Sequence, residues 1–249
     1  MECPRAILFD IDETLAESFQ PPTSEMLEKV SRLARACPVA LISGAGFERI
    51  EKDVLAHFPF SERLYVFPNS SSQCYLFQND RWQTEYNLTL TDTERNHIKK
   101  ALEELFEELP IVKDAPHYGS QIIDREAQVA FTVVGLDAPQ DVKMNWDPDK
   151  SKRCIIVEHL QKKIPDFDIL IGGASTIDVT HKGINKAYGV QWLAQRLGIE
   201  PKEMYYVGDA LYPGGNDFVV IETGIATRIT SGPHETIHIV DELLTACAV

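Results

Sequence analysis

Residues Ile7–Ser18 read ILFDIDETLAES. The first three are apolar, as in a parallel strand that is buried on both faces. Asp10 and Asp12 follow where this strand should end, and side chains two residues apart on an extended segment point the same way. In open α/β sheets, ligands bind just beyond the carboxyl ends of the strands. The stretch therefore predicts a strand that delivers two carboxylates to one reaction space.

The overall composition is that of an ordinary globular protein, with 44% hydrophobic and 25% charged residues. Its 249 residues suffice for one large domain or two modest ones. Lysine and arginine number 24 against 38 acidic residues, which gives a formal net charge of −14. Nucleic acids and anionic membranes both require a basic surface, so we expect neither as a partner.

Five cysteines are scattered along the chain, odd in number and never spaced as C-x-x-C. This pattern favours reduced thiols in a cytoplasmic protein over a disulfide framework or a zinc site. The opening MECPRAILFD carries an acidic residue and runs directly into the first strand, unlike a signal peptide. No apolar run approaches the length of a membrane span. We expect a soluble, cytoplasmic protein.

Strand and helix patterns alternate after the opening stretch. An amphipathic helix is predicted from about Thr23, and the apolar run 39–42 follows it as a second strand. With the first strand these make a β-α-β unit, the start of a parallel sheet. The other predicted elements of this kind are a helical pattern from Phe47 to Phe58, a strand at 64–67, a helix at 184–197, strands at 204–207 and 224–227, and a helix at 235–246.

The region between about Tyr86 and His181 differs in character. A long charged helix is predicted from Thr91 to about Leu109, and another begins in DKSKR (149–153). The predicted strands are 121–124, 128–134, 168–171 and 176–179, with a turn at 125–127 between the first two. Helices beside an antiparallel sheet indicate an inserted α+β module.

Polar residues end three of the predicted parallel strands. They are Asp10 with Asp12, the turn Ser43-Gly44-Ala45-Gly46, and Asp209, while Lys182 and Lys186 begin a nearby helix. Several carboxylates with a hydroxyl, freed amides and a lysine suit phosphoryl transfer with Mg²⁺, which prefers hard oxygen ligands. The turn alone would be read as simple chain punctuation. Neither a P-loop nor a G-x-S-x-G nucleophile elbow is present.

Four motifs, FDIDETL, LISGAG, GINKAYG and VGDALYPGGND, occur in this order. They resemble the four signature motifs of the haloacid dehalogenase superfamily, and an insert between the second and third resembles its subfamily with a large type II cap. PGGND and GGASTIDV are most similar to the eukaryotic phosphomannomutases of that subfamily. The resemblance implies an α/β fold with a Rossmann-like parallel-sheet core, residues 1–85 and 182–249, and an inserted α+β cap domain for substrate specificity, residues 86–181.

The resemblance also implies a role for each matching residue. Asp10 would be the nucleophile that becomes a phosphoaspartate, and Asp12 the general acid for the leaving oxygen and then the base for the incoming one. Lys186, placed in N-K-A-x-G, would offset the charge of nucleophile and phosphate. Phosphate binding is implied for Ser43, Gly44 and Asn216, and Mg²⁺ binding for Asp10, the Asp12 backbone carbonyl, Asp209 and Asp217.

Structural alternatives remain for single residues. Asp217 could be only a helix N-cap, and Lys182 is expected to be solvated. A purely structural reading of Asp10, Asp12 and Asp209 together is disfavoured, because a cluster of uncompensated carboxylates is costly without a cation.

The inserted region bears on which molecule accepts the phosphoryl group. By resemblance, Arg125 matches one arginine of the phosphomannomutase clamp, and Thr176 and Asp178 match residues that contact the sugar. A mutase needs a strong cationic clamp for the distal phosphate of a bisphosphate, yet Leu136 stands where the family carries a second arginine. Lys150, Lys152 or Arg153 are candidate replacements, or simply a solvated helix face. Glu13 also departs from the usual glycine, with a change in the turn as the expected effect.

We therefore predict a Mg²⁺-dependent phosphatase of small phosphorylated sugars such as hexose phosphates. A phosphomannomutase-type mutase, converting mannose 6-phosphate to mannose 1-phosphate, is the close alternative, and a non-catalytic binding module is the remote one. The identity of the sugar is left open, as is a homodimer.

Overall fold

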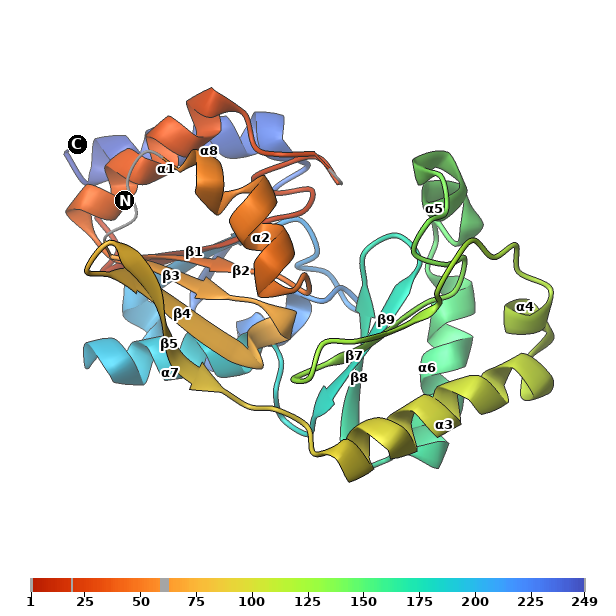
Figure 1. Cartoon of the computed structure of the whole chain (residues 1–249). Coiled ribbons are helices and arrows are strands. Elements are labelled where there is room, and N and C mark those ends of the chain that lie inside the picture. The colour runs from red at the N-terminus through yellow and green to blue at the C-terminus, as the bar shows by residue number, and fades with distance from the viewer. Residues whose placement is uncertain (1, 19, 59–62, 249) are drawn as a thin grey trace. The chain divides into compact units, whose positions relative to one another are not determined.

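The computed structural model describes residues 2–18, 20–58 and 63–248. The chain divides into two compact units, each with its own hydrophobic core. The core unit comprises Met1–Asn87 and Asn185–Val249, and the inserted unit comprises Leu88–Ile184. Both are labelled by their elements in Figure 1.

The core unit is built on a sheet of strand order β11-β10-β1-β2-β3-β4-β5. The five strands from β11 to β3 are parallel, whereas β4 and β5 are antiparallel additions. The strands are β1 (Ala6–Asp10), β2 (Val39–Ile42), β3 (Leu64–Phe67), β4 (Gln73–Gln78), β5 (Arg81–Asn87), β10 (Met204–Gly208) and β11 (Ala226–Ile229). The predicted parallel sheet is confirmed.

Helices cover both faces of this sheet (Figure 1). They are α1 (Ser24–Ala36), α2 (Phe47–Asp53), α7 (Lys186–Leu197) and α8 (Pro233–Ala246), with short 3₁₀ turns at Leu55–His57, Asn69–Ser71, Pro201–Glu203 and Phe218–Thr223. Because side chains alternate along a strand, Ile7 and Phe9 of β1 pack with α1 and α8, while Ala6 and Leu8 pack with α7. All five residues of β1 are buried.

Local sequence signals explain where these helices begin and end. The Thr23 side chain accepts a hydrogen bond from the Met26 amide at the start of α1, as an N-cap does. Asn185 caps α7 in the same way, and Gly198 ends it in the left-handed conformation that glycine adopts without strain. The helical pattern predicted from Phe47 to Phe58 is divided into α2 and a 3₁₀ turn.

The hairpin of β4 and β5 is absent from the sequence-based prediction. Its strands pair from Gln73–Asn87 to Gln78–Arg81 and extend the parallel sheet at its edge. The β5 sequence RWQTEYN is mostly polar and only partly buried, so it lacks the apolar run on which strand prediction depends.

The inserted unit packs helices against an antiparallel sheet of order β6-β7-β9-β8. A core of residues from α3, α6 and the strands fills the space between the two layers. The elements are α3 (Asp92–Glu108), α4 (Pro110–Lys113), β6 (Ile122–Asp124), β7 (Val129–Thr132), α5 (Gln140–Trp146), α6 (Ser151–Lys163), β8 (Phe167–Gly172) and β9 (Thr176–His181). The predicted α+β character is correct, although α4 and α5 were not predicted.

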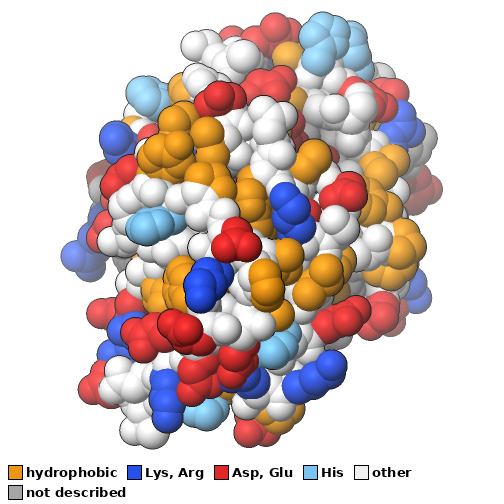
Figure 2. All heavy atoms as spheres, turned by 90° about the vertical axis from the view of Figure 1, so that its right-hand side faces the viewer, with side chains coloured by type: hydrophobic (Ala, Val, Ile, Leu, Met, Phe, Trp, Pro, Cys, Tyr) orange, Lys and Arg blue, Asp and Glu red, His pale blue; other side chains and the backbone are white. Residues whose placement is uncertain are grey.

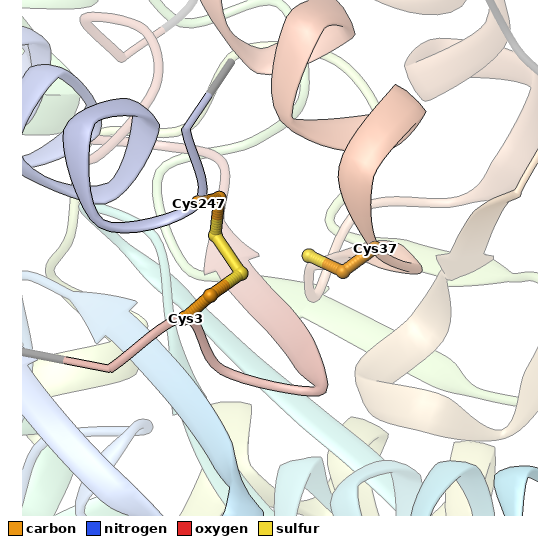
Figure 3. A group of neighbouring side chains, drawn as sticks. All are labelled: Cys3, Cys37 and Cys247. Atoms are coloured by element: carbon orange, nitrogen blue, oxygen red, sulfur yellow. A yellow bond between two sulfur atoms is a disulfide. The ribbon is translucent and has the colours of Figure 1, made fainter.

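Two cysteines that the sequence analysis expects as thiols form a disulfide (Figure 3). Cys3, just before β1, is joined to Cys247, which follows α8, across a sequence separation of 244 residues. The expectation of reduced thiols is wrong for this pair, because the packing of α8 beside β1 and α1 brings together positions that are remote in sequence. Cys37, Cys74 and Cys154 are free.

On the face shown in Figure 2, acidic and basic side chains are interspersed, and no basic patch stands out. Within the described residues, no helix combines the length and the apolar character needed to cross a membrane.

Candidate active site

The register of three neighbouring strands brings the predicted catalytic side chains to one edge of the core sheet. Asp10 pairs with Ile42, so Ser43 follows at the next position of the β2 strand end. Phe9 pairs with Val207, which places Gly208 level with Asp10 and Asp209 just beyond it. This edge is the carboxyl end of the parallel strands, where the sequence analysis expects the site.

Lys186, the first residue of α7, is bound by two of the carboxylates. Its Nζ lies 2.5 Å from Asp10 Oδ1 and 2.6 Å from Asp217 Oδ1, and the lysine side chain is only 2% exposed. The Asn185 cap fixes the start of the helix, and so the point from which the ammonium reaches the carboxylates. Lys182, by contrast, is exposed and pairs with Asp168.

Asp217 is held by contacts on both of its carboxylate oxygens. Besides Lys186, the Tyr206 hydroxyl donates to Oδ1 at 2.5 Å, and the Ala210 amide donates to Oδ2 at 3.1 Å. Asp217 precedes a 3₁₀ turn, but its side chain makes no capping hydrogen bond. Gly208 is required beside it, because a Cβ there would lie 2.4 Å from Asp217 Oδ2.

The electrostatics of the cluster indicate a shortage of positive charge. Burial raises the pKa of Asp10 well above its usual value, Lys186 opposes this, and Asp217 and Asp209 add to it. Burial alone would lower the pKa of Lys186, but Asp10 and Asp217 outweigh it, so the ammonium form is retained. Burial, and then Asp217, raise the pKa of Tyr206, which keeps its hydroxyl as a donor.

These residues fit a magnesium ion. Asp10, Asp209 and Asp217 offer carboxylate oxygens within 4.8 Å of one another, and hard oxygen ligands are those that Mg²⁺ prefers. Lys186 is the ammonium that pairs with Asp10 and Asp217, and a divalent cation would offset the negative charge that remains on the three carboxylates.

Ser43 is buried, and two hydrogen bonds hold its turn in place. Its Oγ accepts a hydrogen bond from the Ala45 amide at 3.0 Å, and the side chain is 2% exposed. Gly44 follows directly, and Gly46 precedes α2. The Ser43 carbonyl accepts from the Ser70 amide at 2.8 Å, which ties the loop to the turn after β3. Asn216 lies on the loop after β10, partly buried, next to Asp217.

Asp12 has a partner that the sequence analysis missed. Arg49 of α2 places Nη2 2.6 Å from Asp12 Oδ1, while Asp12 is about a quarter exposed. Between the two aspartates and the next helix, Glu13 adopts φ of +57° and its Oε1 accepts from the Ser18 amide at 2.9 Å. The positive φ explains why glycine suits this position in the family pattern, and the change at Glu13 is one of turn geometry.

In the inserted unit, Arg125 and Asp178 are neighbours. Arg125 lies in the β6–β7 turn and donates to Gln128 Oε1 at 3.2 Å. Burial raises the pKa of Asp178 to about 6, against the opposing effects of Arg125 and Gln128. Thr176 lies two residues before Asp178 on β9, so the two side chains point to the same side of the sheet.

Two of the candidate replacements for the missing arginine, Arg153 and Lys152, are engaged elsewhere. Arg153 is 2% exposed, pairs with Asp147 at 2.9 Å, and donates to the carbonyls of Gly172 and Gly173. It is neither a solvated helix face nor a phosphate ligand.

Lys152 donates to the Trp146 carbonyl at 2.5 Å and lies over the Trp146 ring. Lys150 adopts a left-handed conformation at the start of α6. Leu136 is 51% exposed, and the ammonium found beside it belongs to Lys143, which donates to the Leu136 carbonyl at 2.7 Å.

Tyr206, Arg49 and Lys143 were missed because each contacts a residue outside its own strand or helix, 11, 37 and 7 residues away in sequence, respectively. Tyr206 reads as one more apolar position of a strand, and only its place directly before Val-Gly-Asp hints at the site. Arg49 reads as an exposed helix residue, and its closeness in sequence to the Ser43 turn is the available signal.

The eukaryotic phosphomannomutase family profile matches residues 26–246. The chain belongs to this family. Eukaryotic phosphomannomutases are haloacid dehalogenase superfamily proteins, so the resemblance drawn from the four motifs is confirmed. As a member, the chain is an enzyme of the phosphotransferase or phosphohydrolase type.

Curated relatives of this phosphomannomutase-family chain are similar over nearly their whole length. The phosphomannomutase of Saccharomyces cerevisiae is 23% identical over 247 residues, covering 95% of this chain and 93% of the yeast protein. That of Triticum aestivum is 27% identical over 250 residues, covering 92% and 91%.

Solved structures share the fold. The N-terminally truncated IMP-nucleotidase of Plasmodium falciparum, bound to IMP, has a TM-score of 0.70 at 19% identity and covers 97% of this chain and 68% of that one. SMU.1108c from Streptococcus mutans has a TM-score of 0.66 at 15% identity, with coverages of 97% and 99%. The predicted α/β fold class is confirmed.

Proposed function

We propose that this protein is a hexose-phosphate mutase of the phosphomannomutase type, acting through a phosphoaspartate on Asp10. The observation that carries the proposal is the buried cluster of Asp10, Lys186 and Asp217 in a chain of the phosphomannomutase family. The relatives named phosphomannomutase support a mutase better than the phosphatase favoured in the sequence analysis.

In the first half-reaction Asp10 attacks phosphorus. Lys186 binds Oδ1, so Oδ2 is the attacking atom, forming an O–P bond as the bond from phosphorus to the sugar oxygen breaks. Asp12 gives its proton to that departing oxygen. Ser43, the Gly44 amide and Asn216 bind the phosphoryl oxygens.

In the second half-reaction a different hydroxyl of the sugar attacks the phosphoaspartate. Asp12, now ionised, takes the proton of this hydroxyl as the new O–P bond forms, and Asp10 is released as a carboxylate. Arg49 holds the Asp12 carboxylate between the two steps through its 2.6 Å contact.

Asp10, Asp209, the Asp12 backbone carbonyl and, directly or through ordered waters, Asp217 would hold Mg²⁺. When bound, Mg²⁺ supplies positive charge that lowers the repulsion between the carboxylates and the phosphoryl group. Tyr206 and Lys186 keep Asp217 oriented for this task.

We assign recognition of the sugar phosphate to Arg125, Thr176 and Asp178 of the inserted unit. Arg125 supplies a planar cation suited to phosphate, and Thr176 and Asp178 supply a hydroxyl and an acid on the same side of β9. Lys143, beside Leu136, is the cation we assign in place of the absent arginine.

Phosphorus NMR tests the proposal directly. With Mg²⁺ and mannose 6-phosphate, the full chain should form mannose 1-phosphate, faster when hexose 1,6-bisphosphate is added, with little free phosphate. Release of inorganic phosphate without any 1-phosphate would overturn the mutase assignment and leave the phosphatase.

A phosphatase of hexose phosphates is the second candidate, and Leu136 favours it. An exposed leucine cannot bind the distal phosphate of a bisphosphate, and Arg153, a candidate replacement, is buried. In that case water attacks the phosphoaspartate, and hexose 6-phosphates should release phosphate with Mg²⁺.

Asp10→Asn tests the shared chemistry of both candidates. This variant should lose turnover and phosphoenzyme formation, because an amide cannot act as the nucleophile. Asp80→Asn, on the exposed β4–β5 turn, is the matched control and should keep both. Normal activity of Asp10→Asn would contradict the assignment of the nucleophile.

The proposed setting is the cytoplasm, with a small phosphorylated sugar as substrate and a homodimer as the assembly. The acidic net charge of −14 supports the exclusion of nucleic acid as a partner. In that reducing compartment, Cys3 and Cys247 would be held mainly as thiols, and the disulfide would form under oxidising conditions.

A further inference from the structure

A third sulfur lies beside the disulfide, and the proposed function does not use it. Cys37 ends α1, and its Sγ lies within 4.8 Å of those of Cys3 and Cys247 (Figure 3). The three come from the segment before β1, the end of α1 and the end of α8. When the disulfide is reduced, three thiols therefore converge.

We propose that the reduced protein binds a zinc ion through Cys3, Cys37 and Cys247. In a tetrahedral site with Zn–S bonds of about 2.3 Å, two sulfurs lie about 3.8 Å apart. The three Sγ atoms already lie within 4.8 Å of one another. The two disulfide sulfurs must move apart, and Cys3, exposed in a segment without helix or strand, is free to make that movement.

The backbone holds the other two ligands in place. The Cys37 amide donates to the Leu33 carbonyl, and the Cys247 amide donates to the Leu243 carbonyl, so both are fixed at helix ends. Lys29 of α1 pairs with Asp241 of α8 at 2.7 Å, which holds the two helices together. The site would therefore need only the Cys3 segment to adapt.

The charges around the site act in two directions. Two helix C-termini meet here, and each carries partial negative charge from carbonyl groups that lack helical partners, which favours the zinc ion and opposes the thiolates. Zinc with three thiolates carries a net charge of −1, and Arg63, which interacts with Cys37, partly offsets it.

Binding requires that zinc displace three protons, one from each thiol, so that three Zn–S bonds form. Thiolates are soft ligands that bind zinc in preference to harder cations. Cys3 is exposed, which leaves the fourth position of the zinc to water.

The test measures bound zinc in the full chain. Protein reduced with a phosphine, or left oxidised, is equilibrated with Zn²⁺ and ultrafiltered, and the zinc retained per chain is measured. Reduced wild type should hold one more zinc ion per chain than oxidised wild type or reduced Cys37→Ser. Zinc at the Asp10, Asp209 and Asp217 carboxylates is common to all samples and cancels.

Cys154→Ser is the matched control, because Cys154 is free, exposed and located on α6 of the inserted unit. It should bind as much zinc as wild type. Cys3→Ser changes an exposed position and should lose the extra zinc without disturbing the core, which keeps the test valid if Cys37→Ser folds poorly. Equal zinc in reduced wild type and Cys3→Ser would overturn the proposal.

Cobalt gives a second readout. Co²⁺ added to reduced wild type should produce the charge-transfer absorption of thiolate ligands, which oxidised wild type and reduced Cys3→Ser should lack. Absence of this absorption from reduced wild type would equally overturn the site.

Discussion

Lys186 is the single cation found against the buried carboxylates of the core unit, within the residues that the structure describes. Its position also matters for the stability of the fold. Removing one partner of a buried ion pair leaves the other charge unpaired, which is far more costly than losing a surface contact.

The variant Lys186→Met should therefore unfold more readily. In Mg²⁺-free buffer we expect it to lose about 3 kcal/mol of stability, since Asp10 and Asp217 lose their partner. Lys182→Met removes an exposed lysine paired with Asp168 and should change stability by less than about 1 kcal/mol. Urea denaturation measures both, and equal losses would contradict the account.

Asp178 gives a pH-dependent prediction. Its pKa is raised by burial from 3.8 to about 6 in the folded chain. Between these values the folded protein retains a proton that the unfolded chain releases, so stability falls as the pH rises through this range and remains lower above it.

The Asp178→Asn variant has no carboxyl group at this position, so its stability does not fall in this way as the pH rises. Relative to wild type, its stability should increase by on the order of 2 kcal/mol between pH 4 and pH 7. Urea denaturation of both proteins at each pH measures the difference. A difference that stays constant with pH, or that moves in the opposite direction, would contradict the burial of an ionised Asp178.

At the scale of elements, the turn after β3 is a strained part of the core unit. Asn69, Ser70 and Ser71 follow one another with φ of +49°, +55° and +73°, a conformation that costs side chains of this kind of order 1 kcal/mol or more each. The turn holds the Ser43 loop through the Ser70 amide and packs under α7, where Gly189 leaves room for Ser71.

Glycine variants at two adjacent serines allow the cost of backbone strain to be measured separately from the effect of side-chain packing. Ser71 and Ser72 are both fully buried, and their hydroxyls have no hydrogen-bond partner. Ser72 has φ of −67°, so only Ser71 gains from glycine. We expect Ser71→Gly to be more stable than Ser72→Gly by about 1–2 kcal/mol, measured by thermal unfolding. Equal effects would show that the turn is unstrained.

The predictability of each element follows from its sequence pattern. Strands β1, β2, β3 and β10 are short apolar runs closed by a polar residue or a proline, so both their existence and their polar ends could be predicted from sequence. Strand β5 of the hairpin lacks such a run, and α5 is a seven-residue helix without a side-chain N-cap. Neither carries enough local signal to compete with a loop.

The residues of the candidate site also differ in how far the sequence predicts their positions. Asp10, Ser43 and Asp209 could be placed together because parallel strands align their carboxyl ends. Arg49 on Asp12 and Tyr206 on Asp217 depend on how loops return toward the sheet, and no short stretch encodes that. The burial of Arg153 could not be predicted either, because its partner Asp147 becomes buried only when the inserted unit folds.

For the whole molecule, the disulfide spans nearly all of the chain. Cys3 and Cys247 both lie in the core unit, so their bond restricts the unfolded chain over a loop of 244 residues. Sequence reasoning fails here, since two cysteines so far apart carry no spacing pattern.

Reduction should therefore destabilise the core unit. We expect a loss of about 2–4 kcal/mol when the bond is opened in metal-free buffer. Urea denaturation with and without a phosphine measures this, with Cys154→Ser as a control that should behave as wild type. An unchanged midpoint on reduction would contradict a stabilising bond.

The same bond gives the folded polypeptide the topology of a ring. Residues 3 to 247 form a covalently closed loop that includes both units. A protein-unfolding machine that pulls the chain through its pore from either side reaches one cysteine of the disulfide first. From that point, two segments of polypeptide must pass through the pore together. Oxidised protein should accordingly resist threading-dependent degradation, and a cut at the exposed Asn79–Asp80 turn should leave a single covalently connected molecule.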